Sequence, residues 1–179
     1  MPYSATLIAL AFVKKGIESG KFVTQMKLQK MVYFAHGYHL AKYGTPLIVE
    51  EFQAWKFGPV VPSIYQAYRF YGSKPITNLD YIMADLSSAA IYALDAAALD
   101  AIEYTWKVTE NITAEALSNW THQPESPWYE VYNPDVFSIP ISNRSIENYF
   151  RSLLIKDHAQ RSADPAPPAP SSQYTTTRS

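Results

Sequence analysis

Apolar residues recur at helical spacing in several separate stretches of the chain, each preceded by a residue that can cap a helix. Ser4 can cap a first helix, which should end near Gly16 or Gly20, and Thr24 can cap a second that ends at Gly44. The second helix carries an apolar stripe made of Leu28, Met31, Val32, Ala35, Tyr38 and His39. A helix this apolar over most of its circumference is expected in the protein interior.

Further helices are predicted from the same two signals. One begins at Pro62, whose missing N–H suits a first turn, and others follow the capping residues Asp95, Thr113 and Ser142. The helix after Asp95 should run to Glu110 and turn three apolar residues inward. These are Leu99, Ile102 and Trp106.

Residues 47–57 are rich in β-formers and alternate weakly, which predicts a strand or short hairpin. The side chains of Trp55 and Phe57 should then project from the same face of the strand. Gly58-Pro59 is expected to turn the chain, and Pro62 to restart it as a helix. The predicted result is a stiff junction between a strand and a helix.

The predicted fold class is mainly α: one compact helical domain over residues 4–155 with a small β element. From residue 162 to 179 the chain holds proline, alanine and hydroxyl residues with almost nothing to bury. Such a composition predicts a disordered C-terminal tail.

Composition narrows the classes of function. The chain has 179 residues, 47% of them hydrophobic, no cysteine and a net charge of −1. Disulfides and cysteine nucleophiles are therefore excluded, and no nucleic-acid partner is expected. The apolar run near the N-terminus is too short to span a bilayer and has no leader pattern. We expect a cytoplasmic protein with no membrane partner.

Candidate chemistry is sparse. His36 and His39 are three residues apart on the second helix and could share a metal ion, with His122 and Glu125 completing the site. Such histidine pairs are common, and His39 lies in the apolar stripe, so core histidines are favoured. The chain has no nucleophile elbow or phosphate loop. Glu50-Glu51 is expected to be an exposed pair, and we predict neither enzyme activity nor a cofactor.

Four segments together resemble the Panacea domain, a family that includes the SocA-like antitoxins and was long labelled phage-associated. The segments are "KLQKMVYFAHGYHLAKYGTPL" (27–47), "FQAWKFGPVVPSIYQAYRFYG" (52–72), "LSNWTHQPESPW" (117–128) and "ISNRSIENYF" (141–150). Their order and spacing match the family from about residue 4 to residue 155. Met31 and Ile64 depart from the usual leucine and valine, as volume-similar apolar exchanges.

The resemblance implies an antitoxin that neutralises a toxin encoded beside it, in most members by direct protein–protein binding. In the SocA branch it implies instead an adaptor that delivers the toxin to the ClpXP protease. Many family toxins inhibit translation, and no catalytic residues are attributed to the domain. Oligomeric state, toxin identity and the choice between the two routes stay open.

We hypothesise that the strand–helix corner and one side of the second helix lie together and form the partner-binding region. Its residues are Gln29, Tyr33, His36, Trp55, Lys56, Gly58, Pro59 and Tyr65. For each residue, packing inside the junction and contact with the toxin remain alternatives, because large aromatics serve both uses.

Overall fold

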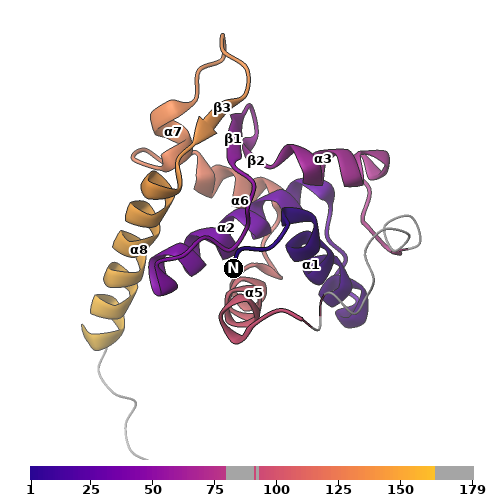
Figure 1. The fold of residues 1–179 in the computed structure, drawn as a ribbon, viewed down its shortest axis with the longest axis horizontal. Coiled ribbons are helices and arrows are strands. Elements are labelled where there is room, and N and C mark those ends of the chain that lie inside the picture. Colours follow the sequence, from indigo (N-terminus) through magenta and orange to yellow (C-terminus); the bar gives the residue numbers. More distant parts are fainter. Residues whose placement is uncertain (80–90, 92, 164–179) are drawn as a thin grey trace, which may run out of the picture.

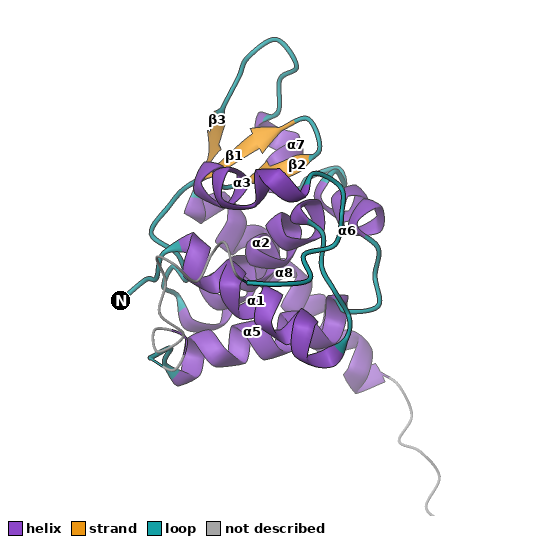
Figure 2. Ribbon diagram, turned by 90° about the vertical axis from the view of Figure 1, so that its right-hand side faces the viewer, coloured by secondary structure: helices purple, strands orange, loops and turns teal. Residues whose placement is uncertain are grey.

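A computed structural model describes residues 1–79, 91 and 93–163, and it confirms a mainly helical domain with a small β element. A three-stranded sheet lies at one end of the helical body and α5 lies at the other (Figures 1 and 2). The helical elements are α1 (Ala5–Ser19), α2 (Gln25–Tyr43), α3 (Pro62–Tyr68), the 3₁₀ turn η1 (Arg69–Tyr71), α5 (Ala96–Thr109), α6 (Ala114–Thr121), α7 (Pro127–Val131) and α8 (Asn143–Ala163). The strands are β1 (Phe52–Trp55), β2 (Gly58–Val60) and β3 (Ile139–Ile141).

The helix starts follow from local capping chemistry. Side-chain oxygens of four residues accept hydrogen bonds from N–H groups of the first turns, as predicted for Ser4, Thr24, Asp95 and Thr113. Ser142 does the same for α8 by accepting the N–H of Ser145. Gly20 and Gly44 end α1 and α2 with positive φ, a conformation that glycine adopts without strain.

Helix α2 is the centre of the molecule. It packs against α1, α3, α5, α6, α8 and β2, and every residue of its predicted apolar stripe is buried. At Gly37 the ring of Phe150 lies so close that an added Cβ would be 2.4 Å from it. This glycine therefore sets how near α8 can approach α2.

Of the two predicted alternatives, a strand or a short hairpin, the structure forms the hairpin, over residues 52–60 instead of 47–57. β1 pairs antiparallel with β2, with Trp55 opposite Gly58, so Lys56 and Phe57 form the tip. The prediction that Gly58-Pro59 turns the chain is wrong, because both residues belong to β2. Gly58 has a φ of 103°, which allows the sharp return that the two-residue tip requires.

Two elements and one burial assignment differ from the predictions. Strand β3 pairs with the outer edge of β1, giving the order β2-β1-β3, and α7 begins at a capping Ser126. β3 has three residues and α7 has five, and both are too short to show a periodic pattern in the sequence. Leu99 is 46% exposed, because α5 instead packs through the face that holds Ala98 and Ile102.

The predicted tail over residues 162–179 lies outside the described residues, apart from the last turn of α8, which continues to Ala163.

Candidate functional site

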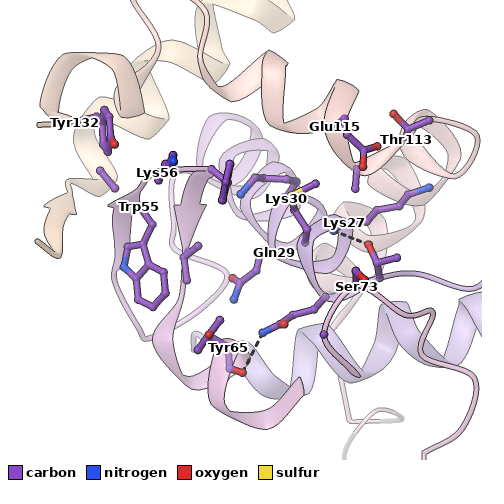
Figure 3. A pocket seen from close by; sticks show the side chains of 18 of the residues that line it. Lys27, Gln29, Lys30, Trp55, Lys56, Tyr65, Ser73, Thr113, Glu115 and Tyr132 are labelled. Atoms are coloured by element: carbon purple, nitrogen blue, oxygen red, sulfur yellow. Dashed lines mark hydrogen bonds between the residues drawn. The ribbon is translucent and has the colours of Figure 1, made fainter. Parts of the chain in front are cut away.

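A groove of about 1100 Å³ opens beside the hairpin, between the first half of α2 and the corner that joins α5 to α6 (Figure 3). Its other walls come from α3 and from the loop between α7 and β3. The residues of α2, the hairpin and α3 that line it are Gln25, Met26, Lys27, Gln29, Lys30, Ala54, Trp55, Lys56, Phe57, Val60 and Tyr65. Four of the eight predicted partner-binding residues thus lie at this groove: Gln29, Trp55, Lys56 and Tyr65.

Gln29 fixes the hairpin to α2. Its side-chain oxygen accepts the N–H of Val61 at 2.9 Å, and its side-chain nitrogen donates to the Val61 carbonyl at 3.2 Å. Both bonds are buried, where hydrogen bonds hold geometry most firmly. One amide therefore satisfies both backbone groups at the point where β2 ends and α3 begins.

Tyr33 and His36 lie behind the sheet. Both rings contact Phe52 of β1, with ring centroids 5.2 and 5.4 Å away. The Nδ1 atom of His36 accepts the Ile48 N–H at 3.4 Å, and Nε2 donates to the Asn143 side-chain oxygen at 2.9 Å. Burial lowers the pKa of His36 to about 4, so the ring is neutral at pH 7.

Lys30 and Gly58 meet under the hairpin. Lys30 is 1% exposed, and its ammonium donates to the Pro59 carbonyl at 3.1 Å. Burial lowers its pKa to about 7. A Cβ on Gly58 would lie 2.6 Å from Thr121 Oγ1 and 2.8 Å from Lys30 Cε, so only glycine fits between them.

An aromatic rim of Trp55, Tyr65 and Phe137 borders the groove. The Trp55 ring lies 5.2 Å from that of Tyr65 and 5.7 Å from that of Phe137. Tyr65 is exposed and Phe137 is 84% exposed, while Trp55 is half-buried. Phe137 could not be predicted as a site residue from the sequence, because it is more than eighty residues from Trp55 and lies in no periodic segment.

Exposure divides the predicted partner-binding residues into two groups. Trp55, Lys56 and Tyr65 reach the surface. Five others are buried, namely Gln29, Tyr33, His36, Gly58 and Pro59, which fits the alternative that they pack within the junction. Which of the eight residues contact the partner stays a prediction. Gln29 still lines the groove floor.

The three candidate histidines form hydrogen bonds within the fold. His39 Nδ1 donates to the Thr45 carbonyl at 2.7 Å, and His122 Nδ1 donates to the Ser118 carbonyl at 2.6 Å. Within residues 1–79, 91 and 93–163, no cluster of three histidine or acidic side chains could hold a metal ion.

The acidic pair is not a pair of exposed charges. Glu50 is half-buried and accepts the N–H of Ala5 at 2.8 Å, which stabilises the positive end of α1. Only Glu51 is exposed as predicted.

The fold and the groove define a small helical domain with a largely apolar groove beside a hairpin that is hydrogen-bonded to α2. The family model described as "Antitoxin SocA-like, Panacea domain" matches residues 28–129, more than half of the chain. The chain therefore belongs to this family, as its resemblance predicted.

A curated relative, "Antitoxin SocA" of Caulobacter vibrioides (strain NA1000 / CB15N), is 32% identical over 114 residues. The match covers 62% of this chain and 61% of that relative, so less than two thirds of the relative's length is spanned. No solved structure matches the chain. Among the described residues, no helix is both long and apolar enough to cross a membrane.

Proposed function

We propose that this chain is the antitoxin of a toxin–antitoxin pair and neutralises its toxin by direct binding at the aromatic rim and groove. Membership of the SocA-like family supports the antitoxin role. The observation that carries the location is the partly exposed rim of Trp55, Tyr65 and Phe137 beside a large, mostly apolar groove. Exposed apolar patches of this kind mark interaction sites, and aromatic side chains dominate binding energy there.

The support behind the rim favours tight binding. Trp55 is held by Gln53, whose side chain accepts its Nε1–H at 3.0 Å, and the Trp55 carbonyl accepts the indole N–H of Trp128 at 2.8 Å. A preorganised surface loses little conformational entropy when a partner binds. The rim can therefore contribute most of its contact energy to affinity.

We further propose that the pair acts in the cytoplasm and that the toxin inhibits translation. The second expectation rests on the family resemblance. It is tested by expressing the toxin alone and following incorporation of labelled amino acids against labelled nucleotides. The proposal is supported if amino-acid incorporation falls before nucleotide incorporation does. An unchanged rate of amino-acid incorporation contradicts it.

The central experiment is co-expression of this chain with each neighbouring open reading frame, scored for toxicity and rescue. A product that is lethal alone and harmless with this chain is the partner. Trp55→Ala should then weaken binding by about thirtyfold or more, as for other aromatic hot spots, with a small change in melting temperature. The matched control is Phe70→Ala, which removes an 88% exposed aromatic away from the groove and should leave rescue intact.

The alternative route is delivery of the toxin to a ClpXP-type protease. Direct neutralisation predicts that rescue and toxin abundance persist in cells without the protease. Rescue that requires the protease, with toxin disappearing only when it is active, would establish the adaptor route instead.

A large drop in the melting temperature of Trp55→Ala would show that this tryptophan stabilises the fold rather than binding the partner.

A further inference from the structure

The groove contains a cation with no carboxylate partner. Lys30 lines the groove floor, yet as a residue it is 1% exposed (Figure 3). Among the described residues its ammonium has one hydrogen-bond acceptor, the Pro59 carbonyl, and forms no ion pair. An ammonium can donate three hydrogen bonds, and a buried charge without a counter-ion is costly. An apolar side chain of similar length would fill this place without that cost.

The charged residues that line the groove also favour a negatively charged ligand. Three lysines line it, Lys27, Lys30 and Lys56, against two glutamates. One of the glutamates, Glu110, is already bridged to Lys21 at 3.1 Å. The groove thus offers an apolar surface with an excess of positive charge, and this complements an apolar segment that carries negative charge.

We propose that the groove binds an acidic, apolar segment of the partner protein and that one carboxylate of this segment pairs with Lys30. The proposal rests on the proposed function, since it names the chemistry of the segment that the antitoxin would recognise. The aromatic rim holds the apolar side chains of the segment, and the Lys30 ammonium supplies its specificity. A neutral segment of the same shape leaves the ammonium desolvated without a partner and binds poorly.

The test compares the full chain with Lys30→Met, using the toxic neighbouring product as the probe. Lys30→Met keeps the length of the side chain and removes its charge, and we expect about thirtyfold or more loss of affinity. The matched control is Lys42→Met, which removes a lysine from the same helix outside the groove and should bind like the parent chain. Equal affinity of Lys30→Met and the parent chain would show that Lys30 only packs the hairpin, and would overturn the proposal.

The pH dependence gives a second readout. Affinity of the parent chain should fall about tenfold between pH 6 and pH 8.5 as Lys30 loses its proton, whereas Lys30→Met should lose this dependence. The other titratable groups around the groove are Lys27 on α2, Lys56 at the hairpin tip, Tyr65 on α3, Glu110 at the C-cap of α5, Glu115 on α6, His122 at the C-cap of α6 and Tyr132 at the C-cap of α7. They remain in Lys30→Met, so a pH dependence that survives this substitution would come from them and would contradict the proposal.

Substitutions in the toxin identify the carboxylate. Each aspartate or glutamate is changed to its amide, and coupling to Lys30→Met is measured in a double-mutant cycle. One strongly coupled position supports the pairing, and no coupling beyond about twofold at any position overturns it.

If no neighbouring product binds the parent chain, the proposed function fails by itself. The site is then judged by titration with 3-phenylpropionate, which should raise the pKa of Lys30, against 3-phenylpropanamide, which should not. An unchanged Lys30 titration with the carboxylate rejects the site.

Discussion

At the scale of single residues, the buried polar side chains of α2 differ in how fully they are hydrogen-bonded. Gln29 and His36 each use two side-chain atoms to bind other parts of the chain. Lys30 binds one carbonyl and carries a charge that burial disfavours. Two kinds of pH dependence should follow, one from the histidine and one from the lysine.

His36 should make the protein less stable in mild acid. Its pKa is about 4 in the folded protein and near 6.5 in the unfolded chain, so the unfolded state binds the proton first as pH falls. The stabilisation is complete above pH 6.5 and is lost towards pH 4, by about 3 kcal/mol in total. Urea unfolding at several pH values measures this loss. His36→Gln, which can still donate to Asn143, should show a shallower acid slope, and an unaltered slope would contradict the assignment.

Lys30 should act in the alkaline range. Its folded pKa of about 7 lies below the 10.5 of an ordinary lysine, so between these values the unfolded chain binds a proton that the folded protein does not. The free energy of unfolding should therefore rise as pH increases from 7 to 10. Lys30→Met should remove this rise and be more stable near pH 7 by roughly 1–4 kcal/mol, because a charge is no longer buried. Denaturant titrations of both proteins test this, and a less stable Lys30→Met would show that the ammonium is well solvated or paired.

At the scale of elements, close packing of α8 on α2 depends on Gly37. Alanine favours a helix over glycine by about 1 kcal/mol, but its Cβ would lie 2.4 Å from the Phe150 ring. The packing contact outweighs the propensity because the Phe150 ring is held against α2 by ring contacts to Tyr33 and Phe34.

Gly37→Ala should accordingly destabilise the protein by about 1–3 kcal/mol, the usual range for overpacking. In a Phe150→Ala background the clash disappears, so the same substitution should become neutral or stabilising. Thermal unfolding of the four proteins in this cycle gives the coupling energy. Equal effects of Gly37→Ala in both backgrounds would show that the ring does not constrain the helix.

At the scale of the whole molecule, the domain is organised as one unit around α2. This helix contacts elements at both ends of the body, including strand β2 of the sheet and α5 at the opposite end (Figure 2). Because the sheet and the helices share this helix as their core, neither end has a separate hydrophobic core.

Unfolding should therefore be a single cooperative transition. Circular dichroism reports all helices, while tryptophan fluorescence reports Trp106 on α5, Trp55 in β1, Trp120 on α6 and Trp128 on α7. The two signals should give the same midpoint in denaturant. Separate midpoints would show that the sheet end unfolds independently of the helical body.

The sequence by itself determined the positions of the long helices, the apolar face of α2 and the family. Caps and helical periodicity are properties of neighbouring residues, so Ser4, Thr24, Asp95 and Thr113 could be identified without the fold. Four separate motifs in the right order were enough to indicate the family that the comparisons confirm.

Tertiary structure alone decided the site. The pairing of β3 with β1, the approach of Phe137 to Trp55 and the burial of Lys30 under Pro59 all join residues that are distant in the chain. No local pattern encodes such contacts, because they depend on how the helices and the hairpin pack. For the same reason the sequence could name Gln29, Tyr33 and His36 beside Trp55, but only the packed structure separated the residues that support the groove from those that border it.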